Sequence, residues 1–237
     1  MIYEHIRNIW NIPELKRKIG ITLGLLIIYR VGTHIPLPGI AIKNLAAWQE
    51  SQGVSAFAGI LALYSSISGG ALSNLAVFSL GIMPYISASI IFSLLTKVIP
   101  SLEELHKEGP GGQAKINEWT RYATVPLCVI QSIFIVRWIV GTQLPVGPLV
   151  DTSLFPMWLF YVTTILSLTG GAIFLMWLGE QITEYGIGNG ISVLIMAGIV
   201  VDLPYIVTAL MEGANDSTES GSGFSILLVL AGVFVLV

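Results

Sequence analysis

The sequence contains little charge for its 237 residues. Asp, Glu, Lys and Arg together make up 11% of it, whereas soluble globular domains contain about 25%. No charged residue occurs in 51–96, 122–136, 152–179, 185–201 or 220–237. Apolar stretches of this length between charged clusters predict several membrane-spanning helices and exclude an ordinary soluble domain.

Cysteine is scarce too, and so are the motifs of catalytic and metal sites. A single cysteine, Cys128, excludes an intrachain disulfide and a paired-cysteine metal site. The histidines His5, His34 and His106 form no HExxH zinc motif. The glycine cluster at 186–190 lacks the lysine of a phosphate-binding loop and predicts a tight turn. We therefore expect no enzyme activity, no metal and no cofactor, and the net charge of −3 disfavours nucleic acid as a partner.

The apolar stretches divide into six expected crossings of the membrane. They lie at about 19–35, 75–96, 122–140, 155–178, 188–209 and 223–237, and the last one ends inside an apolar run. Residues 1–18 have the pattern of an amphipathic helix on the cytoplasmic face of a membrane. Residues 212–222 are expected to form a polar outer loop.

The stretch 59–70 is apolar but too short to cross a membrane. Twelve helical residues extend about 18 Å at about 1.5 Å each, against a hydrocarbon core of about 30 Å. Gly69 and Gly70 also interrupt the stretch. We predict a re-entrant half-helix, which must be enclosed by protein or line a watery cavity.

The distribution of basic residues predicts the orientation. Eight Lys and Arg residues fall in 1–18 and 97–121, on one side of the expected membrane. The opposite side has two, Lys43 and Arg137. Because cytoplasmic loops carry the excess of Lys and Arg, the N-terminus is expected in the cytoplasm. With six crossings, the C-terminus returns to the same side.

Three charged residues in or near the crossings have two interpretations each. Arg30 lies inside an otherwise apolar crossing, where an ionisable group is either functional or extends toward the outer interface. Glu180 and Glu184, four residues apart, share one helix face. They indicate either a coupling-ion site or a solvated helix end.

Two pairs of isoleucines have two interpretations, either ordinary lipid-facing or packing surface or the lining of an enclosed interior. Ile82 and Ile86 are four residues apart, as are Ile187 and Ile191, so each pair is expected on one face of a helix. A proline lies inside the first helix, and the glycine cluster surrounds the start of the second. Because lipid penalises irregular backbone, these positions favour an enclosed and partly wet interior.

Four stretches of the sequence resemble the SecY family of protein-conducting channel subunits. They are YRVGTHIPLPGI (29–40), SGGALSNLAVFSLGIMPYISASII (68–91), INEWTRYATV (116–125) and TGGAIFLMWLGEQITEYGIGNGISVLIMAGIV (169–200). The family has about ten crossings in two inverted five-helix halves. The resemblance covers the whole chain and implies an all-α polytopic membrane protein with a SecY-type helical bundle. Residues 19–211 would form the first inverted-repeat half and 223–237 a truncated sixth span, without the remaining second half.

The resemblance also implies roles for individual residues. The half-helix 59–70 would be the plug that seals the resting pore, with Tyr64, Ile67, Ser68, Gly69 and Gly70 within it. The pore ring would consist of Ile82, Ile86, Ile187 and Ile191. One side of the lateral gate would carry Ser87, Ile90, Ile91 and Leu94. The cytoplasmic loop 97–121 would be a docking surface with Lys107, Lys115 and Arg121.

The function implied by the resemblance is passive conduction of polypeptides. The protein would translocate secretory chains across the cytoplasmic (inner) membrane of a bacterium and insert membrane proteins into it. The implied partners are SecE-like and SecG-like small membrane subunits, the SecA motor ATPase, the ribosome, signal sequences, nascent polypeptides and the lipid bilayer. The alternative is a secondary transporter for a small solute, which also uses broken helices and inverted repeats. An intramembrane hydrolase is disfavoured because no base is placed beside the serines near the glycines.

Overall fold

The computed structural model describes residues 13–45, 48, 64–144, 147–150 and 156–201, which form a mainly helical fold. The elements in chain order are α2 (Pro13–Gly32), the 3-10 helix η1 (Ile42–Asn44), α5 (Met83–Val98), α6 (Pro100–Lys107), α7 (Pro110–Gly141), β1 (Gln143–Leu144), β2 (Gly147–Pro148) and α8 (Met157–Tyr185). A further apolar helix follows at Gly190–Val201.

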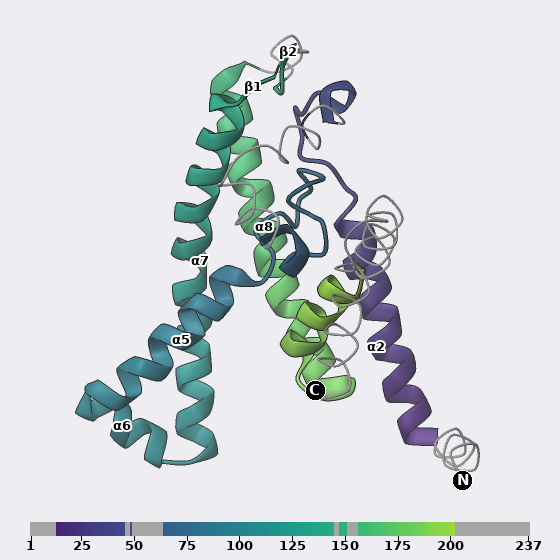
Figure 1. The fold of residues 1–237 in the computed structure, drawn as a ribbon. Coiled ribbons are helices and arrows are strands. Elements are labelled where there is room, and N and C mark those ends of the chain that lie inside the picture. The colour runs from purple at the N-terminus through teal and green to yellow at the C-terminus, as the bar shows by residue number, and fades with distance from the viewer. Residues whose placement is uncertain (1–12, 46–47, 49–63, 145–146, 151–155, 202–237) are drawn as a thin grey trace, which may run out of the picture.

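The long helices α7 and α8 run side by side and form the centre of the structure (Figure 1). α2 contacts α8, and in this view the helix Gly190–Val201 lies between α2 and the lower part of α8 (Figure 1). α5 and α6 form an arm that returns to the start of α7 (Figure 1). The short strands β1 and β2 pair antiparallel after the end of α7, with Gln143 opposite Pro148. This ribbon of four residues does not change the helical class.

Prolines determine where several helices begin. α6 begins at Pro100, and the preceding Ile99 is extended with ψ of 114°, as expected for a residue before proline. α7 begins at Pro110 after Gly109, whose φ is 82°. A proline in the first turn needs no amide hydrogen, because that group has no partner within the helix. The expected loop 97–121 therefore consists of the end of α5, all of α6 and the first part of α7.

Two helices of the described residues, α7 and α8, are long and apolar enough to cross a membrane. α5 and α6 count as a third if the pair, which is bent by 100°, is taken as one span. α2 has 20 residues, of which Glu14, Lys16, Arg17, Lys18 and Arg30 are charged. The expected sixth crossing at 223–237, the outer loop 212–222 and residues 1–12 of the expected surface helix 1–18 lie outside the described residues. Residues 13–18 of that helix belong to α2, which continues into the first expected crossing. The number of six crossings therefore stays a prediction.

The crossing expected at about 75–96 begins later than the sequence pattern indicated. α5 starts at Met83, and residues 68–82 form mainly turns. Gly69, Gly70 and Gly81 have φ values of 66°, 79° and 56°, which glycine adopts without steric cost. Apolar composition suggested a helix here, but these left-handed glycines prevent one from starting before residue 83.

The turn segment 71–82 packs at the centre of the fold between two apolar clusters. The first cluster joins Leu75 and Leu80 to buried side chains of α7 and α8. The second joins Phe78 and Ile82 to side chains of α2, α8 and the helix Gly190–Val201. Because close-packed interiors resist displacement of their side chains, both clusters hold this non-helical segment in place.

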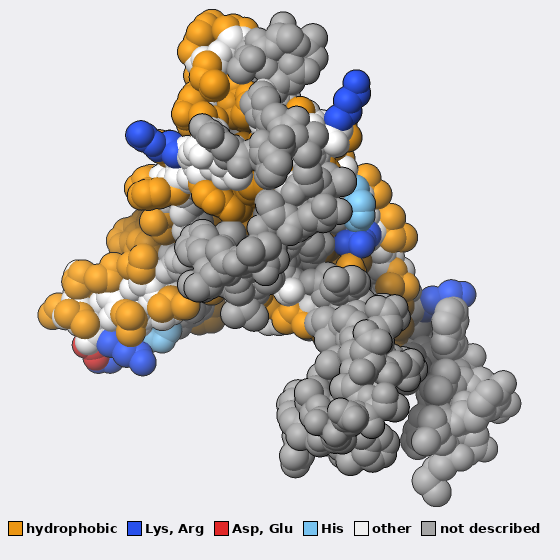
Figure 2. Space-filling model, turned by 45° about the horizontal axis from the view of Figure 1, so that its top comes forward, with side chains coloured by type: hydrophobic (Ala, Val, Ile, Leu, Met, Phe, Trp, Pro, Cys, Tyr) orange, Lys and Arg blue, Asp and Glu red, His pale blue; other side chains and the backbone are white. Residues whose placement is uncertain are grey.

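The outer surface of the helices is largely apolar. Figure 2 shows hydrophobic side chains over much of the described part of the visible face, where charged side chains are confined to a few places. Ile27, Val98, Phe134 and Leu166, from four different helices, are each more than half exposed. A surface with so many exposed apolar side chains suits hydrocarbon rather than water.

Candidate pore and sealing segment

The described part of the predicted plug is residues 64–70, here called the plug segment. Residues 64–67 form one helical turn, and Gly69 and Gly70 follow in a turn. The Tyr64 hydroxyl donates a hydrogen bond of 2.8 Å to the carbonyl oxygen of Leu80. The hydroxyls of Ser65 and Ser73 are hydrogen-bonded at 2.7 Å. These bonds join the plug segment to the turns that precede α5, while residues 59–63 lie outside the described part of the chain.

Polar groups of the turns before α5 find partners nearby. The Ser79 hydroxyl donates to the carbonyl oxygen of Ala76 at 2.6 Å. Backbone hydrogen bonds also connect Leu75 and Val77 to residues 35–37, at 2.8 and 2.9 Å. Irregular backbone inside a membrane is tolerated only when protein or water satisfies its polar groups. This bonding satisfies polar backbone groups that a helix would otherwise pair.

Three of the four predicted pore-ring residues belong to one apolar cluster. Ile82 is buried there, and Ile86 and Ile191 pack against it from α5 and the helix Gly190–Val201. The Ile86 amide donates to the Ile82 carbonyl at 3.1 Å, so these two occupy one turn as predicted. Ile187 differs, because it precedes the helix, is 40% exposed and belongs to neither cluster. The prediction that Ile187 and Ile191 share one helix face is wrong.

The glycine cluster at 186–190 explains this difference, because it is the turn that starts the next helix. The side-chain oxygen of Asn189 accepts a hydrogen bond of 3.1 Å from the Ile191 amide and caps the helix. A Cβ on Gly190 would lie 1.9 Å from the carbonyl oxygen of Gly179 in α8. Only glycine therefore permits this close approach to α8, and the tight turn expected from the sequence is confirmed.

The predicted lateral-gate residues fall into two groups. Ile90, Ile91 and Leu94 project from α5 and are about half exposed. Ser87, by contrast, lines a cavity between the plug segment, the start of α5 and α7. The apolar outer group suits contact with lipid, whereas the half-buried Ser87 faces this cavity.

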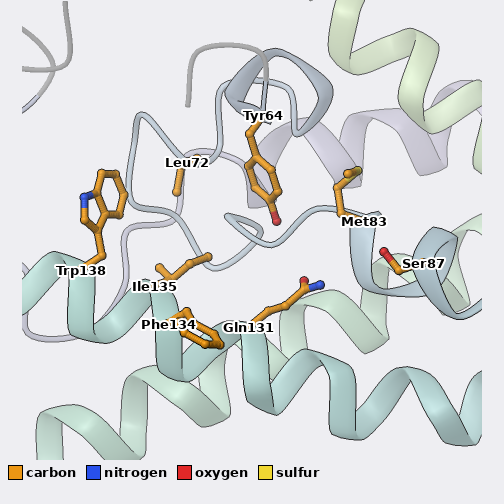
Figure 3. Close-up of a pocket in the computed structure, with 8 residues that line it drawn as sticks. All are labelled: Tyr64, Leu72, Met83, Ser87, Gln131, Phe134, Ile135 and Trp138. Carbon is orange, nitrogen blue, oxygen red and sulfur yellow. The ribbon is translucent and has the colours of Figure 1, made fainter. Parts of the chain in front are cut away.

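The cavity beside Ser87 measures about 230 Å³ and is lined mainly by apolar side chains. Figure 3 shows Tyr64 and Gln131 extending into the same space from opposite sides, Gln131 from α7. The remaining lining residues are Leu72, Met83, Phe134, Ile135 and Trp138. The Gln131 side-chain oxygen is buried and has no hydrogen-bond partner among the described residues. Sequence analysis missed Gln131, although it is the single amide side chain in the uncharged run 122–136.

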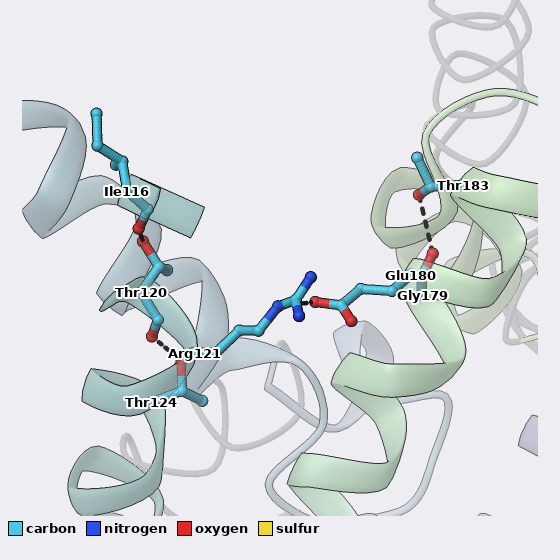
Figure 4. A network of polar contacts seen from close by, with 7 residues as sticks. All are labelled: Ile116, Thr120, Arg121, Thr124, Gly179, Glu180 and Thr183. Atoms are coloured by element: carbon cyan, nitrogen blue, oxygen red, sulfur yellow. Dashed lines mark hydrogen bonds and ion pairs between the residues drawn. The ribbon is translucent and has the colours of Figure 1, made fainter. Parts of the chain in front are cut away.

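An ion pair connects α7 with α8. Arg121 Nε lies 2.6 Å from Glu180 Oε1, with about half and a quarter of the two side chains exposed (Figure 4). The pair borders a polar cavity of about 600 Å³ that Tyr85, Glu184 and Ile191 also line. Sequence analysis assigned Arg121 to docking and Glu180 to a helix end or an ion site. The structure joins these two residues in an ion pair that lines the same cavity as Ile191.

The other two predicted docking residues are both exposed, Lys107 at the end of α6 and Lys115 in the first part of α7. Lys107 forms a salt bridge with Glu103 one helical turn earlier. The hydrogen bond and the charge of Lys107 lower the pKa of the Glu103 carboxyl. Leu102 is buried on the opposite face of α6, so the helix presents its charged side outward.

The SecY family model matches residues 76–237. The chain belongs to the SecY family. It is 47% identical over 226 residues to the protein translocase subunit SecY of Buchnera aphidicola subsp. Acyrthosiphon kondoi, covering 95% of this chain and 60% of that protein. It is 47% identical over 222 residues to the SecY subunit of Escherichia coli K12, covering 93% and 47%. The SecY subunit of Aquifex aeolicus is 43% identical over 231 residues, with 96% and 52% covered.

Solved structures show the same fold. One, described as a protein conducting channel, and another, canine Sec61 in a ribosome-channel complex from the endoplasmic reticulum, each align with a TM-score of 0.61. Each is 18% identical, with 93% of this chain and 46% of the other chain covered. The predicted SecY-type helical fold is confirmed, and a solute transporter is not favoured. The family and the fold are those of a channel protein rather than of an enzyme. The relatives named above are bacterial, and the apolar helices agree with a multi-pass membrane protein. The chain spans about half the length of these relatives.

Proposed function

We propose that this chain forms the N-terminal half of a channel through which unfolded polypeptides cross, or enter, the cytoplasmic membrane of a bacterium. The apolar cluster around Ile82, Ile86 and Ile191 is the observation that carries this proposal. It lies directly beside the plug segment. Gly81, the residue before Ile82, is close to Ser68 of that segment, because a Cβ on Gly81 would lie 3.2 Å from the Cβ of Ser68. An aliphatic constriction next to a movable short helix closes a pore to ions by keeping it dry.

The remaining sites follow the path of a polypeptide. The polar cavity bordered by Arg121 and Glu180 is the cytoplasmic mouth that leads to Ile191. Ser87 faces the interior while Ile90, Ile91 and Leu94 face lipid, an arrangement suited to a gate through which apolar signal sequences leave for the bilayer. Lys107 at the end of α6 and Lys115 in the first part of α7 dock the SecA motor or the ribosome, and that partner supplies the energy for transport.

The full-length protein, purified with its small SecE-like and SecG-like membrane subunits and reconstituted into vesicles, tests the proposal. With SecA, ATP and a secretory precursor, part of the precursor should become protected from external protease. The same precursor without its signal sequence is the matched control and should stay accessible. If the signal-bearing precursor stays accessible as well, while the vesicles take up a small solute, the transporter is the correct interpretation.

A further inference from the structure

Arg30 of α2 contacts the plug segment directly. One guanidinium nitrogen donates a hydrogen bond of 3.1 Å to the carbonyl oxygen of Gly69, at a partly buried position 39 residues away in sequence. Gly69 follows the helical turn 64–67, where carbonyl groups lack donors from their own helix. Sequence analysis left open whether Arg30 is functional or extends toward the interface. The hydrogen bond shows that its charged end is directed to the plug segment.

The same turn is confined by its other neighbours. A Cβ on Gly69 would lie 2.6 Å from the Tyr29 hydroxyl oxygen. Two successive residues of α2, Tyr29 and Arg30, therefore contact the turn at Gly69. On the helix Gly190–Val201, a Cβ on Gly198 would lie 2.9 Å from the carbonyl oxygen of Ile67 and 3.1 Å from the Gly69 amide nitrogen. At Gly69 the turn therefore fits between two helices without space for an additional methyl group, whereas a Cβ on Gly70 would meet no atom within 4 Å.

We infer that Arg30 is a positioning residue that clamps the base of the plug segment against the helix Gly190–Val201 and so holds the pore closed. This inference rests on the proposed function and adds its closing device. Displacing the plug segment breaks the bond to Gly69 and leaves the guanidinium group of Arg30 without that acceptor in partly apolar surroundings. Hydrogen bonds of charged groups are stronger than neutral ones. The bond between Arg30 and Gly69 therefore stabilises the closed position relative to the displaced one.

The test measures how often the plug segment becomes accessible, without requiring transport. Ser66→Cys is introduced into the full-length protein in a Cys128→Ala background, and its reaction with a small thiol reagent is timed in reconstituted vesicles. Arg30→Gln should accelerate the labelling about tenfold, which corresponds to about 1.4 kcal/mol. Arg30→Lys keeps a charged donor on a long stem and should give an intermediate rate.

Two controls separate positioning from general loosening of the fold. Arg137→Gln removes an exposed arginine of α7 far along the chain and should leave the labelling of Ser66→Cys unchanged. Ser89→Cys reports on α5 at a half-buried position and should react equally fast with and without the Arg30→Gln substitution. Unchanged labelling of Ser66→Cys in Arg30→Gln overturns the inference, and so does equal acceleration at both cysteines. Failure of the proposed function would appear separately, as absence of precursor transport by the unaltered protein.

Discussion

The hydroxyl of Tyr64 donates a hydrogen bond of 2.8 Å to the carbonyl oxygen of Leu80. The bond joins the start of the plug segment to the turn that leads into α5. Tyr64 also lines the same cavity as Ser87 and Gln131. Movement of the plug segment is thereby linked to the helix that carries the predicted lateral gate, through one side chain.

Tyr64→Phe removes this hydrogen bond and leaves the ring in place. Leu80 is fully buried, so its carbonyl loses its donor without access to water, and such a loss typically costs about 1–3 kcal/mol. We expect a several-fold higher resting ion leak through the reconstituted full-length channel, because the closed position is favoured less. Tyr122→Phe is the matched control, since it removes an exposed hydrogen bond to Glu118. Equal leaks in both variants would show that the Tyr64 bond has no role in closure.

The isoleucine cluster should act as a dry barrier to ions. Ile86→Asn together with Ile191→Asn places two amides at its edge and should admit water, so that small ions leak through reconstituted vesicles. The control is Ile90→Asn with Ile195→Asn, one turn further along each helix, where Ile90 is more than half exposed. If the control pair leaks as much as the cluster pair, or if neither leaks, the isoleucines serve packing alone.

The sequence indicated much of this fold because the signals lay in long runs. The uncharged runs around α7 and α8 identified both long helices, and Pro110 and Pro156 correspond to their starts. Helix starts within glycine-rich stretches were harder to predict, since the apolar pattern of the sequence does not distinguish a buried turn from a helix. Residues 75–82 and Ile187 were therefore assigned to helices that begin later, at Met83 and Gly190.

Contacts between distant residues were beyond the sequence pattern. Arg121 and Glu180 are 59 positions apart by number and were interpreted separately, although they form one ion pair. Arg30 and Gly69 were each noticed, but nothing in their spacing predicts a hydrogen bond between them. Such pairs depend on how helices cross, which packing decides rather than local propensity.

The packing of α6 against α7 should depend on one glycine. A Cβ on Gly112 would lie 1.6 Å from the carbonyl oxygen of Leu105, so Gly112→Ala must displace α6. We expect a cost of about 1–3 kcal/mol, as for other overpacked sites. Limited proteolysis should then cut the segment around α6 faster than in the unaltered protein.

The adjacent glycine provides the control for this change. A Cβ on Gly111 would meet no atom within 4 Å, so Gly111→Ala should leave the proteolysis rate unchanged. Equal rates for the two alanine variants would mean that α6 does not pack on α7 as described. Docking of SecA, measured in the same preparations, should weaken only with Gly112→Ala if the fixed position of α6 supports it.

The orientation of the chain can be tested with single cysteines in intact cells. Cys128 is fully buried and is the one cysteine of these 237 residues, so it is first replaced by alanine, together with any cysteine in the rest of the full-length protein. Gln113→Cys then reports on the expected cytoplasmic loop and Lys43→Cys on the expected outer segment, and both positions are exposed. Because cytoplasmic loops carry the excess of Lys and Arg, an impermeant maleimide added outside should label only Lys43→Cys. After lysis both cysteines should react, which shows that Gln113→Cys was protected by the membrane rather than by the fold. Labelling of Gln113→Cys in intact cells would contradict the predicted orientation. Lys107 and Lys115 would then lie outside the cell, where neither a motor ATPase nor a ribosome can dock.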